Sequence, residues 1–299
     1  MKFKIFLALG GLLTFAYFAY GFINNNDEGA LAKDSFSKFW YDGNAEINSY
    51  TLSQNRYGET HDGNAVLIFV TEDFSKRKQV KLDNPDEAGS DRQPVLKLNF
   101  TKSFLTGIYP YTIMNSVFSP IDLSGAVKST CSVQEWCGHT FTQINKTKIG
   151  FDSKEFSYFE SEGDDTKSLP SGILEDELWN MIRINPSKIP LGRVQLLRGN
   201  IAVKLMHRPL EYVVAEIFRG KATIEQKNFT TLNIVFPERK LVIYYDDKFP
   251  HTIHGWDETY GEFGNTATVT SARLKKSIRL PYWKLHNKEH LSYRDSLGI

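Results

Sequence analysis

Hydrophobic and polar residues alternate with a period of two along much of the chain. In the stretch VLKLNF, Leu96, Leu98 and Phe100 share one face. In TLNIVF, Leu232 and Ile234 do the same, and a Pro-Glu-Arg turn then leads into the apolar run KLVIYY. A period of two is typical of β-strands with one buried face. Two such runs joined by a short turn indicate a β-hairpin.

The same criteria predict further strands, and they favour few helices. The additional strands are Ala65–Thr71, Ile108–Val117, Lys146–Phe151, Glu155–Glu160, Arg193–Leu197, Ile201–Met206, Tyr212–Phe218 and Ala267–Arg273. Apolar residues three and four apart favour helices over Ser171–Ile184, which Pro186 ends, and over Lys284–Ser296. We therefore expect a mainly β fold. Its antiparallel sheet is curled into a barrel or half-barrel, or forms a sandwich, with one or two short helices.

The beginning of the chain has a different pattern. Lys2 and Lys4 precede an uncharged apolar run from Ile5 to Ile23, and the polar stretch NNNDEG follows it. A cationic start, an apolar centre and a polar exit are typical of an export signal. The run also has the length of roughly 17–25 residues with which an apolar helix spans a bilayer. The pattern predicts a signal peptide or an uncleaved membrane anchor, with the rest of the chain outside the cytoplasm.

These observations predict how the chain is divided. Residues 1–23 are the signal peptide or membrane anchor, residues 24–38 a linker, and residues 39–299 a β-rich extracytoplasmic domain. The stretch ESEGDDTKS has the composition of an exposed connection and predicts a sub-boundary near residues 160–170. The expected location is the periplasm or the cell envelope.

The charge balance excludes one class of partner. Residues 1–23 contain two of the 36 basic residues and none of the 35 acidic ones, so the rest of the chain has a formal net charge of −1. A near-neutral chain lacks the basic surface of a nucleic-acid-binding protein. We therefore expect no nucleic-acid partner. The membrane is an expected partner if the N-terminal segment is uncleaved, and the oligomeric state stays open.

The two cysteines, Cys131 and Cys137, lie in the stretch CSVQEWC. Because an exported protein meets an oxidising compartment, we expect a disulfide that closes a short loop around Trp136. The spacing differs from the C-x-x-C of thiol oxidoreductases, and two cysteines do not make a zinc site by themselves.

The densest group of ionisable residues is PHTIHGWDETYG, residues 250–261. In a strand, His254, Trp256 and Glu258 share one face and Asp257 lies on the other. At ~3.3 Å per residue, His254 and Glu258 are roughly 13 Å apart, which is too far to bind one ion. We therefore favour a structural strand with Trp256 packed inward, and we expect neither a metal nor a cofactor.

The alternative is a catalytic site that uses the same stretch. Its candidates are His254, Asp257 and Glu258, together with His139 just after the second cysteine. Acid–base catalysis needs such groups within hydrogen-bond reach of one another. The chain contains neither a G-x-S-x-G nucleophile elbow nor an H-E-x-x-H motif. The sequence favours a role other than an enzyme, and it leaves an envelope hydrolase open.

Four stretches together carry a resemblance to known proteins. They are FWYDGNAEINSY, VLIFVTEDFSKRKQVKLD, IVFPERKLVIYYDDKFPHTIHGWDET and SYRDSLGI. From about Phe39 onwards, the chain resembles a family of uncharacterised bacterial exported proteins, some of which are labelled septum formation inhibitor Maf. Maf-type nucleotide pyrophosphatases are cytoplasmic α/β proteins with an N-terminal S-x-S-x-R-R motif, which this chain lacks. The resemblance therefore implies export but no activity.

A binding or carrier module of the cell envelope is the function that these patterns favour. A curled sheet rich in aromatic residues can present an apolar concavity to a hydrophobic or lipid-like ligand. Trp40, Trp136 and Trp256 are the candidates for contacting that ligand. An envelope hydrolase and a purely structural envelope protein remain the alternatives, and the latter is expected to expose an apolar patch to its partner.

Overall fold

The computed structural model describes residues 34–261 and 268–299. The chain divides into a short unit that ends at Asp42 and a larger unit of residues 43–299. In the short unit, residues 34–40 are helical, and the ring of Trp40 meets that of Phe39 edge-on at 4.9 Å. The predicted signal peptide or apolar anchor helix lies outside the described residues. Within those residues, no helix has the length and apolarity needed to cross a membrane.

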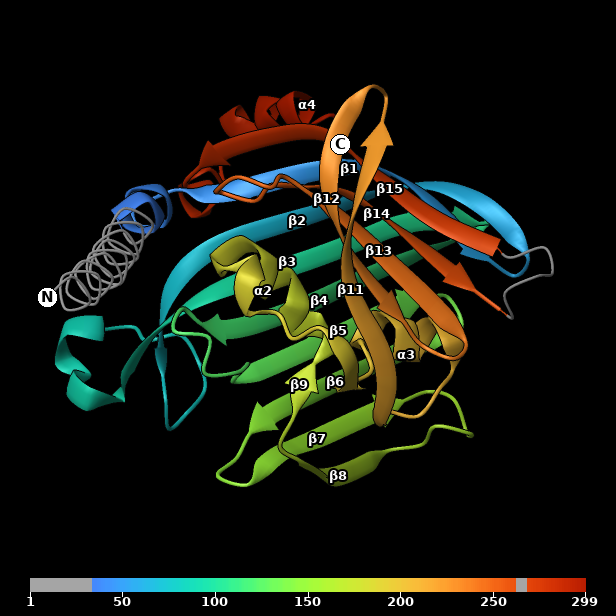
Figure 1. Cartoon of the computed structure of the whole chain (residues 1–299), viewed down its shortest axis with the longest axis horizontal. Helices are drawn as coiled ribbons and strands as arrows, with labels where there is room; N and C mark the ends of the chain where they lie inside the picture. Colours follow the sequence, from blue (N-terminus) through green and yellow to red (C-terminus); the bar gives the residue numbers. More distant parts are fainter. Residues whose placement is uncertain (1–33, 262–267) are drawn as a thin grey trace, which may run out of the picture. The chain divides into compact units, whose positions relative to one another are not determined.

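Fifteen strands form one curved sheet in the larger unit (Figure 1). The strands are β1 Ala45–Arg56, β2 Glu59–Ser75, β3 Arg92–Thr106, β4 Tyr109–Pro120, β5 Lys128–Glu135, β6 Gly138–Lys146, β7 Gly150–Ser157, β8 Asp165–Pro170, β9 Ile173–Leu174, β10 Gly192–Leu197, β11 Tyr212–Ile224, β12 Lys227–Val235, β13 Arg239–Tyr245, β14 Ile253–Tyr260 and β15 Thr268–Leu280. The mainly β fold is confirmed. In the part of the chain that the structure describes, the sheet is single and open, which excludes a closed barrel and a two-sheet sandwich.

The order of the strands places the first strand, β1, beside the last strand, β15. Strands β1 to β8 follow one another towards one edge, β15 to β9 follow one another towards the other edge, and β1 pairs with β15 in the middle. Neighbouring strands are antiparallel except for β9 and β10, which are parallel. Strands β1 to β8 and strands β10 to β15 are therefore two series of antiparallel neighbours in chain order, and the β1–β15 pair joins them.

Short helices cover both faces of the sheet. Helix α2 (Leu178–Ile184) contacts β3 and β4, and helix α3 (Asn200–Met206) contacts β4 and β5. We call the face that carries α2 and α3 the inner face. Helix α4 (Ser292–Leu297) packs on the opposite, outer face, where Leu297 joins a buried cluster with Ile47 and Val70. Single 3-10 turns occur at Pro85–Glu87, Gly89–Asp91, Glu175–Glu177, Pro186–Lys188, Tyr282–Lys284 and Lys288–His290.

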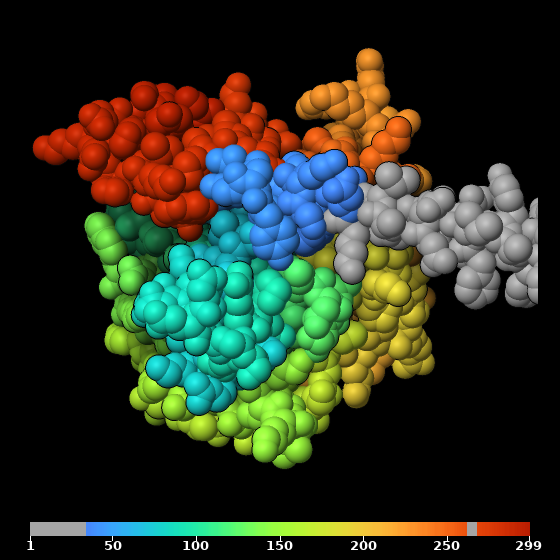
Figure 2. Space-filling view, turned by 90° about the vertical axis from the view of Figure 1, so that its left-hand side faces the viewer, coloured from blue at the N-terminus to red at the C-terminus, as the bar shows by residue number. Residues whose placement is uncertain are grey.

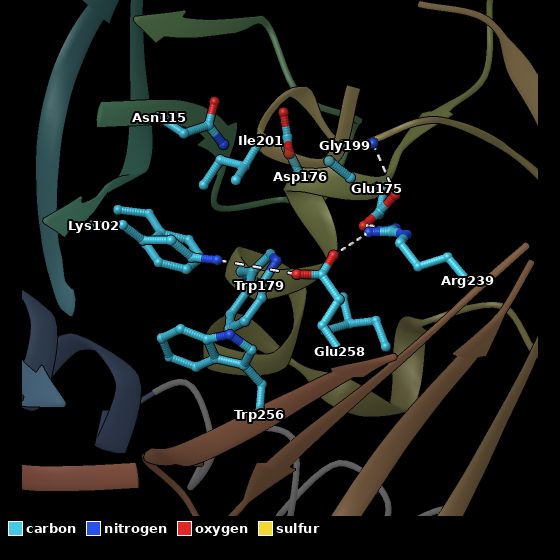
Figure 3. Close-up of a pocket in the computed structure, with 13 residues that line it drawn as sticks. Lys102, Asn115, Glu175, Asp176, Trp179, Gly199, Ile201, Arg239, Trp256 and Glu258 are labelled. Atoms are coloured by element: carbon cyan, nitrogen blue, oxygen red, sulfur yellow. Dashed lines mark hydrogen bonds and ion pairs between the residues drawn. The ribbon is translucent and has the colours of Figure 1, made fainter. Parts of the chain in front are cut away.

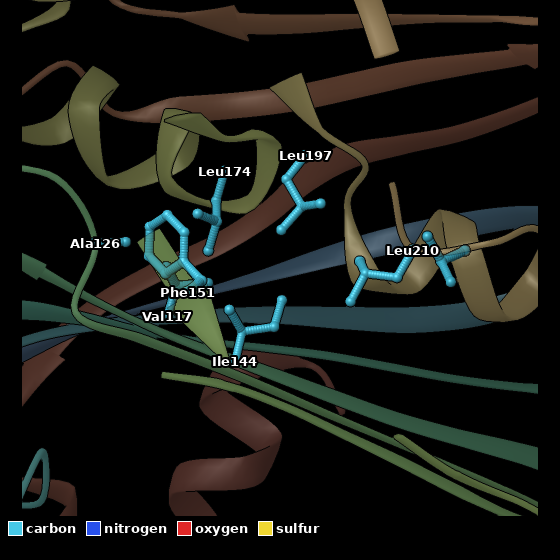
Figure 4. Close-up of a cluster of buried hydrophobic side chains, with 8 residues drawn as sticks. Val117, Ala126, Ile144, Phe151, Leu174, Leu197 and Leu210 are labelled. Carbon is cyan, nitrogen blue, oxygen red and sulfur yellow. The ribbon is translucent and has the colours of Figure 1, made fainter. Parts of the chain in front are cut away.

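A buried hydrophobic cluster connects the two ends of the curled sheet (Figure 4). Side chains of β4, β6 and β7 meet side chains of β9, β10 and α3. The members are Val117, Ala126, Ile144, Phe151, Leu174, Leu197, Val203 and Leu210. These side chains fill the space between the curved inner face and α3.

Several predicted elements differ from the structure. Ile201–Met206, predicted as a strand, lies in helix α3, because a six-residue apolar run does not distinguish the two periods. Lys146–Phe151 was also wrong as a strand, since it contains the turn between β6 and β7. The helix predicted over Ser171–Ile184 begins only at Leu178. Residues 160–170 form the end of the β7–β8 connection and β8, inside the larger unit.

Candidate functional site

Trp256 is buried in the inner face, as predicted, with 1% of its surface exposed. Its ring centroid lies 5.1 Å from Tyr50, 5.0 Å from Phe100 and 5.3 Å from Trp179. Tilted and edge-to-face arrangements at such distances are favourable for aromatic pairs. Trp256 is therefore the centre of an aromatic core, and this packing accounts for its burial.

A β-bulge at the start of β14 interrupts the alternation that was predicted to place His254 on the same face as Trp256. Tyr244 pairs with Gly255 whereas Tyr245 pairs with Ile253, so His254 is the extra residue. A Cβ atom at Gly255 would lie 2.2 Å from a carbonyl oxygen of β15, which explains the glycine. The prediction of strict alternation through this stretch was wrong because the bulge adds one residue.

The four catalytic candidates do not converge on one point. His254 Nε2 lies 2.9 Å from Asp246 Oδ2, whereas Asp257 is ion-paired with an arginine of β15. Glu258 is buried on the inner face, and His139 is exposed at the start of β6. Within residues 34–261 and 268–299, no three His, Cys, Asp or Glu side chains are grouped so that they could hold a metal ion. The arrangement does not assemble the hydrolase site that the sequence left open.

The predicted disulfide is wrong, because Cys131 and Cys137 are not bonded. Cys131 is buried in the middle of β5, and Cys137 is exposed in the two-residue turn between β5 and β6. The five residues of extended strand from Cys131 to Glu135 are separated by four steps of ~3.3 Å and span ~13 Å. A disulfide requires Cα atoms ~4.4–6.8 Å apart. Because the loop is a flat hairpin, Trp136 is not enclosed and has 68% of its surface exposed.

A chain of charged side chains crosses the inner face beside Trp256 (Figure 3). Lys102 Nζ lies 4.0 Å from Glu258 Oε2, and Glu258 Oε1 accepts a 2.7 Å hydrogen bond from Arg239. Arg239 also forms an ion pair with Glu175. All four side chains are buried. Buried charges are tolerated when they are paired, so these groups stabilise one another.

The pKa shifts in this network follow from burial and pairing. Burial lowers the pKa of Lys102, although the carboxylate of Glu258 acts in the opposite direction. Burial alone disfavours the ionised form of Glu258, but the positive charges of Arg239 and Lys102 outweigh it and lower the pKa of this carboxyl. The carboxyl of Glu258 is therefore held in its ionised form.

Asp176 lies next to the network, and the hydrogen bonds to its carboxylate come from neutral groups. Its carboxylate accepts hydrogen bonds from Ser129 Oγ at 3.1 Å and from the side-chain amide of Asn200 at 2.7 Å. Burial, followed by the negative charge of Glu175, raises the pKa of Asp176 to about 6. The adjoining cavity of about 30 Å³ has room for water but not for an organic substrate. This cluster is a structural element of the interior.

The larger opening lies on the outer face of the sheet and has a volume of about 430 Å³. We call it the outer groove. Strands β2 to β5, the β2–β3 connection and the residues that follow β15 line it. In Figure 2, it is the recess between the C-terminal segment, in red, and the β2–β3 connection, in cyan. Its volume lies within the ~300–1,000 Å³ of small-molecule sites.

The C-terminal segment is fixed above the outer groove by α4. Leu297 is buried against the outer face, and its carbonyl oxygen accepts a 2.5 Å hydrogen bond from Ser49 Oγ. The helix predicted over Lys284–Ser296 is thus confined to its end, after two single 3-10 turns. The first of these turns places Tyr282 and Trp283 at the groove.

Two aromatic pairs make up the apolar part of the outer groove. Phe74 and Phe118 are stacked, with ring centroids 4.6 Å apart and an interplanar angle of 25°. Tyr282 and Trp283 meet edge-on at 5.4 Å, and Trp283 has 45% of its surface exposed. Phe74 is buried and supports Phe118 from beneath, so the apolar surface that a ligand can cover comes from the part-exposed rings of Phe118 and Trp283.

Three lysines and one glutamate make up the charged part, so the groove has a formal charge of +2. Glu72 Oε1 lies 2.7 Å from Lys97 Nζ and 3.6 Å from Lys81 Nζ. Lys128 Nζ donates to the carbonyl oxygen of Gln79 at 3.3 Å, and in the described ranges no ion pair joins it to a carboxylate. Burial lowers the pKa of Lys128. Lys128 is therefore a half-buried cation that an anionic ligand can pair with.

Sequence reasoning missed this groove. Lys97 occupies the polar face of a strand that was predicted correctly, and such a position is ordinarily solvent-exposed. Trp283 lies nearly 190 positions further along the chain. A pattern along the sequence carries no signal that the two residues line one recess.

No family model, no curated protein and no solved structure matches this chain. The resemblance to bacterial exported proteins therefore stays a prediction. The function has to be argued from the outer groove, which combines an apolar surface, an unneutralised cation and a volume suitable for a ligand.

Proposed function

We propose that the protein is an extracytoplasmic binding module of the cell envelope, and that it holds an anionic lipid in the outer groove. The observation that carries this proposal is the position of Lys128, a half-buried cation without a carboxylate partner among the described residues, beside the stacked rings of Phe74 and Phe118. The anionic head group pairs with Lys128, and the acyl part covers the exposed surfaces of Phe118 and Trp283.

Both halves of such a ligand contribute to the affinity. Burial of apolar surface is worth about 25 cal/mol per Å². A hydrogen bond to a charged group contributes about 1.5–3 kcal/mol. A neutral lipid gains the first contribution but leaves Lys128 half-buried without a counter-charge, so the groove selects anionic head groups.

The proposed site differs from the concavity that the sequence suggested. Helices α2 and α3 and the buried ion pairs fill the inner face, so a ligand of lipid size has no room there. The outer groove offers the required combination of aromatic and basic side chains on the other face of the same sheet.

The location outside the cytoplasm rests on the N-terminal sequence pattern. A phosphatase that is active only after export, fused behind Asp42, should be active. A reporter that requires the cytosol, fused at the same position, should be inactive. The reverse result would refute the proposed location.

The lipid proposal is tested by titrating the full-length protein with fluorescently labelled phosphatidylglycerol and, as the neutral comparison, phosphatidylcholine. We expect saturable binding of the anionic lipid and at least about tenfold weaker binding of the neutral one, since a tenfold change corresponds to about 1.4 kcal/mol. Replacement Lys128→Gln should weaken binding of the anionic lipid by about the same factor. The matched control is Lys154→Gln, which removes an exposed lysine of β7 on the outer face and should change nothing. Equal affinity for both lipids, or an unchanged Lys128→Gln variant, contradicts the proposal.

A further inference from the structure

Four hairpin turns lie together at one end of the sheet, on the right-hand side of Figure 1. They join β1 to β2, β3 to β4, β5 to β6 and β7 to β8, and they share one end because these strands are antiparallel neighbours. An aromatic side chain lies in or directly beside each turn, and the β7–β8 connection carries a second one, Phe159. We call Tyr57, Tyr109, Trp136 and Tyr158 the tip row.

Contacts link each residue of the tip row to the neighbouring hairpin. Tyr109 donates a hydrogen bond from its hydroxyl to that of Tyr57 at 3.3 Å, and its ring centroid lies 6.4 Å from that of Trp136, with an interplanar angle of 29°. Tyr158 lies on the backbone of Gly138, where a Cβ atom would approach its ring to 2.4 Å. The four hairpins are thus connected through their aromatic residues.

The tip row is held in place from below. The guanidinium of Arg56 lies 4.5 Å from the ring centroid of Tyr57 and donates to the carbonyl oxygen of Leu205 and to the hydroxyl of Tyr111. The hydroxyls of Tyr57 and Tyr111 are 2.8 Å apart. A side chain fixed before binding loses less conformational entropy when a ligand arrives. Tyr57, and Tyr109 through its hydrogen bond to Tyr57, are therefore arranged in advance to receive a ligand.

Three rings of the tip row are largely exposed, so they contribute little buried surface to the fold. Tyr57, Trp136 and Tyr158 have 63%, 68% and 65% of their surfaces exposed. Single exposed aromatic residues are common, but a connected exposed patch marks an interaction surface. Neighbouring hairpins are about 10 Å apart in a sheet, so the row extends over roughly 30 Å. A long, narrow surface of this kind suits a linear polymer.

The surrounding charges decide which polymer fits. Glu59, Glu135 and Glu160 flank the turns, and Arg56 is already engaged beneath Tyr57. Acidic side chains repel nucleic acid and anionic lipid surfaces. A neutral sugar ring has an apolar C–H face, which is attracted by the negative face of an aromatic ring, and hydroxyls at its rim that bond to tyrosine hydroxyls and carboxylates.

We infer that the tip row binds a neutral glycan strand, with sugar rings stacked on Tyr57, Tyr109, Trp136 and Tyr158. The tyrosine hydroxyls and the flanking carboxylates bond to the sugar hydroxyls. This site is separate from the outer groove, which lies on the outer face towards the opposite ends of these strands, beside the β2–β3 connection. The inference therefore stands independently of the proposed lipid ligand.

The test is co-sedimentation of the full-length protein with three insoluble glycans: cellulose, chitin and purified peptidoglycan sacculi. We expect saturable binding to at least one of them, and Trp136→Ala should weaken it by about tenfold or more. The control is Trp283→Ala, which removes an exposed tryptophan of the outer groove and should leave glycan binding intact. Since Trp136 is exposed, its replacement should not change the thermal unfolding temperature. Trp136→Phe, which retains a ring, should restore part of the binding.

Two results overturn this inference. One is the absence of binding to all three glycans. The other is binding that Trp136→Ala and Tyr109→Ala leave unchanged, which assigns the glycan contact to another surface. Sedimentation with neutral phosphatidylcholine vesicles is the parallel measurement, and loss of vesicle binding in Trp136→Ala without any glycan binding would make the tip row a membrane surface instead. Titration of Trp136→Ala with phosphatidylglycerol should match the unaltered protein, which distinguishes failure of this inference from failure of the lipid proposal.

Discussion

Arg183 and Glu46 form a two-point ion pair between helix α2 and strand β1, with Nη1–Oε1 at 2.5 Å and Nη2–Oε2 at 2.6 Å. Both side chains are buried. Asn48 donates a further hydrogen bond to Glu46 at 2.6 Å. A helix of seven residues is too short to be stable in isolation, so this contact and its packing hold α2 in place.

Replacing Glu46 by alanine should destabilise the fold strongly. The change leaves the guanidinium of Arg183 buried without its counter-charge, which costs about 3–5 kcal/mol. Urea unfolding measures the loss in the free energy of unfolding. The double replacement Glu46→Leu with Arg183→Met removes both charges and should recover a large part of it. A double variant as unstable as Glu46→Ala would show that packing, and not the unpaired charge, is responsible.

Asp176 should make the stability depend on pH. Its pKa of about 6 in the folded protein exceeds the usual value of 3.8, so folding favours the protonated form. This contribution is fully present below the unfolded pKa and is lost as the pH rises through about 6. Asp176→Asn, neutral at every pH, should therefore gain stability relative to the unaltered protein between pH 4 and pH 8, by up to about 3 kcal/mol at 1.36 kcal/mol per pKa unit. Urea unfolding at pH 4, 6 and 8 measures this difference, and a constant difference at all three values contradicts the raised pKa.

Trp256 and His254 should respond very differently to substitution. Trp256→Ala leaves a cavity between Tyr50, Phe100 and Trp179 and should cost about 3–5 kcal/mol. His254→Gln loses a part-exposed pair with Asp246, which is worth at most about 1 kcal/mol. Guanidinium unfolding of both variants measures the two effects. Comparable losses in the two variants would be inconsistent with the core role of Trp256.

The two thiols should be free and unequal in reactivity. In the native protein a maleimide should label Cys137, which is exposed, and spare Cys131, which is buried and whose pKa is raised by that burial. After unfolding without a reductant, both should react. Mass spectrometry counts the labels. Unfolded, unreduced protein that takes up no label would demonstrate the bridge that the structure lacks.

Binding of phosphatidylglycerol should weaken at high pH. The head group pairs with the protonated form of Lys128, and burial lowers the pKa of this lysine below its usual value of 10.5. The affinity should therefore fall at a lower pH than for an ordinary lysine. Lys128→Arg stays charged throughout and should abolish this dependence. The same decline in Lys128→Arg would assign it to another group.

The sequence predicts the regular strands well because their burial is one-sided. The hairpin of β12 and β13 forms as expected, with Val235 opposite Lys240. Strand β1 was missed, because Glu46 and Asn48 occupy its buried inner face. Such polar residues break the alternation, and the partner that compensates Glu46 lies 137 positions away. Local pattern carries no information about a partner at that separation.

The site was harder to predict than the fold. Of the aromatic candidates, Trp256 is a core residue, whereas Trp136 belongs to the tip row. The difference arises because Trp256 lies in strand β14, whereas Trp136 lies in the turn between β5 and β6. The disulfide prediction was wrong for a related reason. It rested on the oxidising compartment, whereas Cys131 lies in strand β5 and Cys137 in the turn after it, and the extended strand keeps the two residues apart.

The pairing of β1 with β15 has a consequence for biogenesis. A ribosome releases β1 before β15, so the central seam of the sheet closes only after the strands between them have been synthesised. Until then, the twelve residues of β1 expose an unpaired edge, which is the kind of edge that recruits other chains into aggregates. The N-terminal series of hairpins can form early from local contacts, but it must wait for the second series. The edge of β1 is therefore the one open edge of the first series of hairpins that the finished sheet covers, and β15 is the strand that covers it.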